Sequence, residues 1–171
     1  MWAGVLHLPP SPSFHHQSHA SRILNFFVEV WCPRAGGAAV MQVNVSTAER
    51  GDQDYRIPDV SVMLPERVPH GEATFVRPNV VFEIRSPGDE TDEKLAFSAA
   101  VGVEAVVVVE RDTKAVQVFA LAAGTFVLVP PSADGWTVIG PVGVEVRTES
   151  TDGGSILHLR LRGESQTARG I

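Results

Sequence analysis

The sequence predicts an α/β or α+β domain, because strand patterns dominate the chain and one clear helix pattern interrupts them. Most apolar positions recur with a period of two and many of them are Val or Ile, which is typical of strands. Residues 90–101 instead carry apolar side chains on one helical face, and Gly102 follows where glycine is favoured at a helix end. The β-branched run 103–109 comes next and is typical of a strand covered on both faces. A helix set between strand patterns therefore indicates a mixed core.

The remaining elements follow from the same two periods. We expect a helix from residue 18 to 32, where Cys32 and Pro33 end the apolar spacing. Further strands are expected at 5–8, 40–45, 56–63, 80–85, 115–121, 125–129 and 156–162, of which 115–121 and 125–129 form a hairpin. We expect residues 1–162 to form a single domain and residues 163–171 to be a disordered C-terminal tail.

Composition excludes several classes of protein. The chain has 171 residues, of which 44% are hydrophobic and 20% charged, as in globular domains rather than disordered or disulfide-stapled chains. No apolar run in the chain, the β-branched run 105–109 included, approaches the roughly 18–20 residues that cross a membrane, and the start lacks a secretory leader, so a cytoplasmic location is expected. The lone Cys32 is expected to be a buried or incidental thiol. The net charge of −6 counts against a generic nucleic-acid binder.

Two acidic residues stand within apolar strand patterns and are the first candidates for chemistry. Asp59 follows an Ile-Pro pair, and Glu83 lies inside the strand pattern 80–85. Two acids on neighbouring strands repel unless they share a cation, and a divalent metal ion such as magnesium takes carboxylate oxygens. Replacing either acid should then relieve the repulsion and leave the fold intact or slightly more stable. The alternative is structural, with Asp59 capping a turn and Glu83 pairing with an arginine such as Arg85.

Lys94 is one of only two lysines in the chain and is expected in the first turns of the helix that follows the Glu83 strand. An ammonium group there could orient an attacking water and stabilise charge on phosphoryl oxygens. The alternative is an exposed pair between Glu90 and Lys94, one helical turn apart, which is worth about 0.2–0.5 kcal/mol.

Several segments together resemble a known family. They are Trp2-Ala3-Gly4-Val5-Leu6-His7, Pro10-Ser11-Pro12-Ser13 with His16-Gln17, Tyr55-Arg56-Ile57-Pro58-Asp59, Val81-Phe82-Glu83-Ile84-Arg85-Ser86-Pro87-Gly88-Asp89-Glu90-Thr91, and Glu93-Lys94-Leu95 with Gly102-Val103. In this order they resemble the Uma-two family of putative restriction endonucleases, within the PD-(D/E)XK nuclease superfamily. The resemblance extends from Trp2 to the neighbourhood of Leu121.

The resemblance implies a restriction-endonuclease-like fold, a mixed β-sheet core flanked by helices, to which extra C-terminal β-hairpins are added. It also implies a metal-dependent endonuclease that hydrolyses phosphodiester bonds of DNA, with Mg²⁺ as cofactor and Mn²⁺ able to substitute. Asp59 and Glu83 would bind the metal and act in catalysis. Lys94 would position the nucleophilic water from the helix, whereas the superfamily usually places its lysine two residues after the acid.

Four further residues are expected to contact substrate or support the site, namely His16, Arg56, Arg85 and Glu90. By the resemblance, His16 lies where the first helix begins, beside the active cleft. Arg85 stands in the usual lysine position, where it can contact phosphate but cannot act as a base, because a guanidinium group stays protonated.

Other interpretations stay open beside the enzyme. The chain could be a catalytically inactive nuclease-fold module that serves in binding or regulation. An edge strand within 115–129 could pair across a two-fold axis and form a homodimer. His15 and His19 lie one helical turn apart and allow a weak zinc interpretation, although no third ligand is evident.

The strand pattern 156–162 carries a basic stripe on its polar face, formed by His158, Arg160 and Arg162. Such a stripe is more often a solvated face than a contact with nucleic acid.

Overall fold

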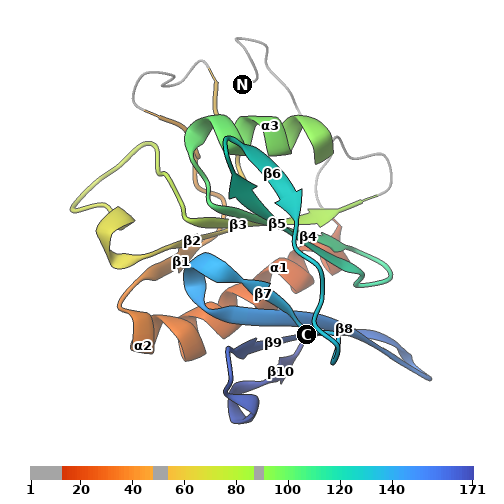
Figure 1. The fold of residues 1–171 in the computed structure, drawn as a ribbon. Coiled ribbons are helices and arrows are strands. Elements are labelled where there is room, and N and C mark those ends of the chain that lie inside the picture. Colours follow the sequence, from red (N-terminus) through yellow and green to blue (C-terminus); the bar gives the residue numbers. More distant parts are fainter. Residues whose placement is uncertain (1–12, 48–53, 87–90) are drawn as a thin grey trace.

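A six-stranded mixed sheet forms the centre of the computed structural model, which describes residues 13–47, 54–86 and 91–171 (Figure 1). Its strands follow the order of the chain, β1 (Ala38–Val40), β2 (Val60–Met63), β3 (Val80–Arg85), β4 (Ala105–Glu110), β5 (Val116–Ala122) and β6 (Thr125–Leu128). Neighbours pair antiparallel except β3 and β4, which run parallel because helix α3 (Thr91–Val101) connects them. The expected strand at 5–8 and the candidate Glu90 lie outside the described residues.

A second sheet of four antiparallel strands forms the C-terminal part of the chain. Its order is β10-β9-β8-β7, with β7 (Thr137–Ile139), β8 (Val144–Thr151), β9 (Gly154–Leu161) and β10 (Arg169–Gly170). Along β9, Leu157, Leu159 and Leu161 are buried while the residues between them are not, as the alternating sequence predicts. The mixed α/β fold with additional C-terminal hairpins is therefore confirmed.

The first helix consists of three consecutive segments, α1 (Phe14–Phe26), a π-helical turn (Phe27–Trp31) and α2 (Cys32–Ala35). The hydroxyl of Ser13 caps its start by accepting a hydrogen bond from the backbone N–H of His16 at 3.3 Å. The helix continues past Pro33, where the sequence predicts an end, because the π-helical turn places this proline in the first turn of α2, where its missing N–H is tolerated. No helix among the described residues is long and apolar enough to cross a membrane.

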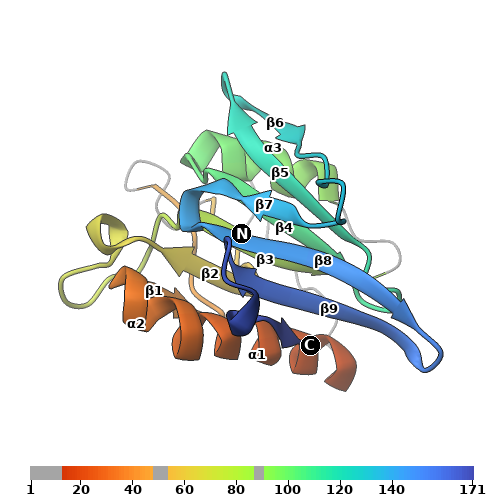
Figure 2. The same cartoon turned by 60° about the horizontal axis from the view of Figure 1, so that its bottom comes forward.

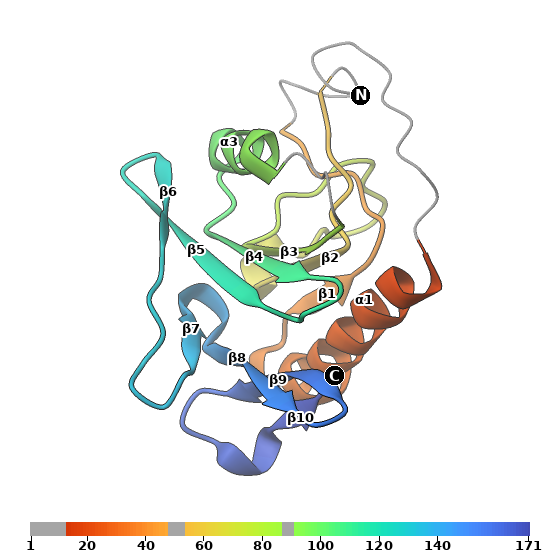
Figure 3. The same ribbon diagram turned by 90° about the vertical axis from the view of Figure 1, so that its right-hand side faces the viewer.

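The two faces of the six-stranded sheet are covered by different elements. Helix α3 covers one face, where Phe97 packs with alternate valines of β4. Helix α1 and the second sheet lie side by side against the other face (Figures 2 and 3), where the rings of Phe27 and Phe82 meet at 5.4 Å. The indole N–H of Trp31 donates to the carbonyl of Val142 at 2.7 Å and joins the first helix to the second sheet.

Residues 163–171 fold back onto the second sheet instead of forming the expected disordered tail. They contain a 3₁₀ turn (Ser165–Thr167) and β10. Ile171 is buried and exchanges two backbone hydrogen bonds with Leu157, at 2.7 and 3.2 Å. The buried C-terminal side chain orders a segment whose composition alone suggests fraying.

The expected strands at 40–45 and 56–63 are both shorter in the structure. Gln42 has a φ of 54°, in the left-handed region, and therefore β1 ends at Val40. Beyond this break, Val45 forms isolated bridges with Arg56 and Val76. Strand β2 begins only at Val60, so Asp59 precedes the strand rather than lying inside it.

Candidate active site

Asp59 and Glu83 lie beside each other where β2 begins. The antiparallel register pairs Val60 with Phe82, so the next position along places Asp59 across from Glu83. The backbone N–H of Ile84 donates to Oδ2 of Asp59 at 2.7 Å. The side chain of Asp59 thus extends the bonding of β2 to β3 by one position and is held there.

Glu83 faces α3, and Lys94 reaches it from that helix. Phe82 and Ile84 belong to the core under α1, so the alternation of β3 turns Glu83 to the opposite face. Glu83 is only 9% exposed, and the Nζ of Lys94, in the first turn of α3, donates to its Oε2 at 2.9 Å. Glu83 therefore meets a lysine of the following helix, while Arg85 pairs elsewhere, with Glu110, and Glu90 lies outside the described residues.

His16 connects α1 to the same pair of strands. Its Nε2 lies 2.7 Å from Oδ1 of Asp59, and both side chains are largely buried. The hydrogen bond to Asp59 raises the pKa of His16 above its ordinary value, and the charges of Asp59 and Glu83 add to this effect while burial and Lys94 oppose it. Two acids and two basic side chains, from α1, the residue before β2, β3 and α3, therefore influence one another at one place.

The protein itself supplies a basic partner for each of the two acids. Each carboxylate accepts a bond from a basic side chain, Asp59 from His16 and Glu83 from Lys94. The repulsion expected between two unopposed acids is thus relieved within the chain. Removing one of the acids is therefore no longer expected to stabilise the fold.

The two arginines proposed as supporting residues take part in other contacts. Arg85 pairs with Glu110, the residue beside it on the parallel strand β4. Arg56 donates to Asp54 at 2.9 Å, and its guanidinium lies 4.5 Å from the ring centre of Phe97. Arg85 therefore lies at the end of β3, close to Glu83, while Arg56 lies against α3.

The chain is similar to a known family and to a solved structure. A family model described as "Putative restriction endonuclease", Uma2, matches residues 1–151. The chain belongs to the Uma2 family. A crystal structure described as a "putative nuclease belonging to DUF820", from Anabaena variabilis, is similar to this Uma2 chain with a TM-score of 0.66 at 18% identity, covering 81% of this chain and 79% of that chain. At this identity the likeness shows the fold alone. No curated protein matches the chain.

The donor set of this Uma2 chain fits a hard divalent cation. Within the described residues no three His, Cys, Asp or Glu side chains gather as a metal-binding group, so the candidates are the two carboxylates of Asp59 and Glu83. Magnesium commonly binds through one or two carboxylates, together with waters and phosphate oxygens of the substrate. Two adjacent acids on neighbouring strands meet that requirement.

The zinc interpretation of His15 and His19 finds no ligand set in the part of the chain that is described. The Nε2 of His19 lies 2.5 Å from the Nζ of Lys114, and the ring of His15 packs edge-on against Phe14. Burial, together with the charge of Lys114, lowers the pKa of His19 to about 4, so its ring is neutral at pH 7. Cys32 is half-buried, and burial raises the pKa of its thiol.

The basic stripe on β9 makes contacts within the second sheet. His158 lies 3.0 Å from Glu149, and Arg160 pairs with Glu145 at 2.6 Å while it stacks on Trp136, 3.9 Å from the ring centre. These contacts favour the interpretation of the stripe as a structural face, while Arg162 at its end is exposed.

One contact near the site, between His19 and Lys114, is not predicted by the sequence. The two residues lie on α1 and in the turn after β4, and no pattern within either segment indicates that they meet. The only signal in the sequence is that Lys114 is the second of two lysines, the first being Lys94.

Proposed function

We propose that this Uma2 protein is a divalent-metal-dependent endonuclease that hydrolyses phosphodiester bonds of DNA. The observation that carries the proposal is the convergence of Asp59, Glu83, Lys94 and His16 from four separate elements. Removing carboxylates from water is costly, and clustered titratable groups with perturbed pKa values are common at functional sites.

Asp59 and Glu83 would hold the metal, Mg²⁺ or in its place Mn²⁺. When bound, such an ion supplies a Lewis acid for the phosphoryl oxygens and lowers the pKa of a water that serves as nucleophile. The N–H of Ile84 fixes one oxygen of Asp59, which keeps the carboxylate oriented.

Lys94 and His16 would act as the cations of the site. The Nζ of Lys94 donates to Glu83, and an ammonium held at this position would orient the attacking water or stabilise charge on a phosphoryl oxygen. His16 holds Asp59 from the side of α1. Arg85, at the end of β3, is proposed to contact substrate, and Glu90, which lies outside the described residues, is proposed as a supporting residue. Arg56 is proposed as a supporting residue through its contact with α3.

Cleavage of supercoiled plasmid in Mg²⁺ tests the proposal, with Asp59→Asn and Glu83→Gln as the informative variants. Both keep the shape of the side chain and remove its charge, so we expect the cleavage rate to fall about 100-fold or more while the fold persists. Asp152→Asn in the turn between β8 and β9 and Glu66→Gln on an exposed turn are matched controls and should cleave normally. Undiminished cleavage by both site variants contradicts the assignment.

A second candidate, a catalytically inactive nuclease-fold module for binding or regulation, is favoured by one observation. Both acids already have basic partners inside the chain, so the cluster is electrostatically balanced without a metal ion. Calorimetric titration with Mg²⁺ and with Mn²⁺ separates the two candidates. Binding at millimolar or lower concentration that disappears in Asp59→Asn supports the enzyme, and its absence supports the inactive module.

We also propose that the chain, as one domain, forms a homodimer through β6. This strand is the edge of the six-stranded sheet, and its Val127 and Leu128 are 48% and 56% exposed. An unpaired edge with exposed apolar side chains can add the same strand of a second copy. Sedimentation velocity of the wild-type chain and of Val127→Lys measures whether this edge joins two copies.

A further inference from the structure

A group of basic side chains that the proposed catalysis does not use lies beside the site. We name it the α1 basic cluster, and it consists of His15, His19 and Arg22 on α1 together with Arg111 and Lys114 in the turn between β4 and β5. Each of its members interacts electrostatically with at least one other member. Two segments that are far apart in the sequence thus gather basic groups on one surface.

The charge of this cluster is only partly neutralised. Arg111 pairs with Asp112 at 2.8 Å. Within the described ranges, Asp112 is also the one acid whose charge acts on Lys114. The ammonium of Lys114 donates to two neutral acceptors, Nε2 of His19 and the carbonyl of Arg111. Arg22 is exposed, and its guanidinium makes no ion pair or hydrogen bond within the described residues. Counted over the described residues, the cluster therefore carries more positive than negative charge, although the net charge of the chain is −6.

The cluster borders directly on the candidate active site. His16, which bonds Asp59, and His19, which bonds Lys114, are separated by about one turn of the same helix, roughly 4.5 Å along its axis. From the other side, the N–H of Arg111 donates to the carbonyl of Arg85 at 3.0 Å, where the parallel strands β3 and β4 end. In sheets with parallel strands, ligands bind preferentially at this carboxyl end.

We infer that the α1 basic cluster binds phosphate groups that flank the cleaved bond on a DNA substrate, with Arg22 and Lys114 as the main contacts. This inference rests on the proposed function for the position of the cleaved bond. Each DNA strand carries one phosphate for about every 3.4 Å of helix axis, so neighbouring phosphates fall within reach of a cluster that begins one helical turn from the site. An acidic protein repels DNA over most of its surface, and a local basic surface lets the substrate approach in one orientation.

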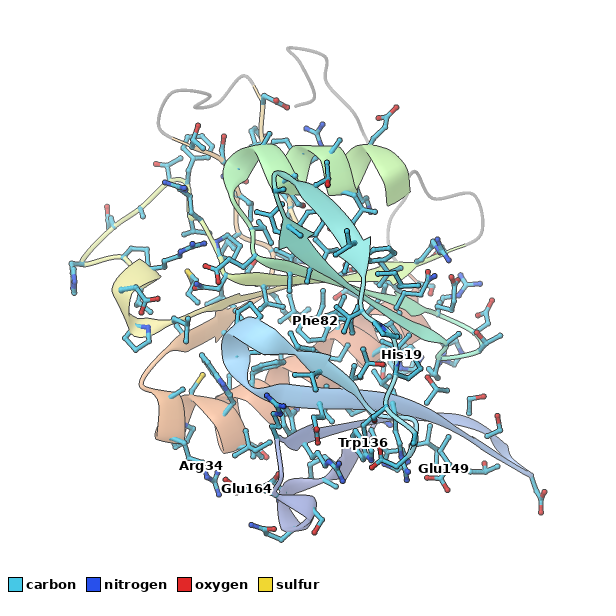
Figure 4. All side chains as sticks on the ribbon, viewed as in Figure 1. His19, Arg34, Phe82, Trp136, Glu149 and Glu164 are labelled. Carbon is cyan, nitrogen blue, oxygen red and sulfur yellow. The ribbon has the colours of Figure 1, made fainter. Side chains whose placement is uncertain are left out.

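Binding of a fluorescent 30-base-pair duplex, measured by anisotropy at several salt concentrations in EDTA, tests the inference without any cleavage. Each lost phosphate contact flattens the dependence of log K on log salt by about 0.9. We expect Arg22→Gln and Lys114→Gln each to flatten the slope by this amount and to weaken binding several-fold at low salt. Arg34→Gln is the matched control, because Arg34 is exposed at the opposite end of the same helix and should keep the wild-type slope (Figure 4).

Hydrolysis of bis(p-nitrophenyl) phosphate separates the two proposals, because this small diester has no flanking phosphates. Arg22→Gln should hydrolyse it like the wild type while its KM for DNA rises. If the wild type hydrolyses neither substrate, the proposed function fails, but the binding slopes still test the cluster. A wild-type slope in both Arg22→Gln and Lys114→Gln, or no binding of the duplex by the wild type, overturns the inference. If Lys114→Gln does not fold, Arg22→Gln and the charge reversal Arg22→Glu decide it alone.

Discussion

Asp59 illustrates how a catalytic candidate can also hold the fold together. Its two oxygens bond His16 and the N–H of Ile84, so removing the carboxylate leaves two partly buried groups without an acceptor. We expect Asp59→Ala to lower the free energy of unfolding by about 1–3 kcal/mol, measured by urea denaturation at pH 7. The sequence alone predicts the opposite sign, since it suggests two acids that repel. Asp152→Ala, in an exposed turn, is the control, and a more stable Asp59→Ala would show that repulsion dominates after all.

His19 gives the protein a defined sensitivity to acid. Burial and the charge of Lys114 lower its folded-state pKa to about 4, below the ordinary value of 6.5 that applies when the chain is unfolded. The unfolded chain therefore binds the extra proton between these two values. The stability that neutral His19 contributes to the folded chain is complete above pH 6.5 and is lost progressively as the pH falls towards 4.

The melting temperature of His19→Gln should accordingly fall less than that of the wild type between pH 7 and pH 4.5. A glutamine can still accept a bond from Lys114 but has no proton to gain in this range. His70→Gln, at an exposed position, should keep the wild-type pH dependence. An equal fall in His19→Gln and the wild type would exclude His19 as the acid-sensitive group.

Elements with a strong local pattern are those that the sequence predicts best. The bounds of β3 are those predicted, 80–85, and β4 lies within one or two residues of its β-branched run, because a strand buried on both faces has little freedom in composition. The end of β1 depends on the left-handed backbone of Gln42, a residue with no special preference for it. The π-helical turn at Phe27–Trp31 likewise depends on packing against the second sheet, through the bond of Trp31 to Val142.

The same distinction holds for the candidate site. Asp59 and Glu83 stand out in the sequence because each is an acid within an apolar strand pattern. Lys94 stands out because the chain has only two lysines. Which basic group meets which acid depends on register and helix placement, and the contact of Arg85 with Glu110 rather than Glu83 follows from the parallel pairing of β3 with β4. Periodicity in a single strand contains no information on that pairing.

The passage from α2 to β1 depends on Gly37. A Cβ at this position would lie 2.3 Å from the carbonyl oxygen of Met63 and 2.6 Å from the ring of Trp31. We expect Gly37→Ala to lower the free energy of unfolding by about 1–3 kcal/mol, because the backbone of β2 and a buried indole cannot both move away. Thermal melts of the two chains measure this. Gly153→Ala, where a Cβ meets nothing within 4 Å, is the control and should melt like the wild type. A neutral Gly37→Ala would mean that the first helix is free to shift against the sheet.

At the scale of the whole molecule, net charge is a poor guide to where an anion can bind. The chain has 14 Lys and Arg against 20 Asp and Glu, yet the second sheet pairs much of its charge internally, as in Arg160 with Glu145. Both lysines lie at or beside the candidate site, one bonded to Glu83 and the other to His19. The acidic balance therefore argues against binding over the whole surface, while it leaves open binding at one place.

The C-terminal segment joins the second sheet to the common core, and its removal tests how far the fold depends on it. Ile171 belongs to the core that α1 shares with both sheets, and the hydroxyl of Thr167 accepts the N–H of Leu161 at 2.8 Å. Deleting residues 163–171 should lower the free energy of unfolding by about 2–4 kcal/mol, from the lost burial of one isoleucine and the lost hydrogen bonds. Urea denaturation of the truncated chain measures this, and Gln166→Ala, at an exposed position of the same segment, should change little. An unchanged midpoint after truncation would restore the expectation of a disordered tail and would place the end of the domain at Arg162.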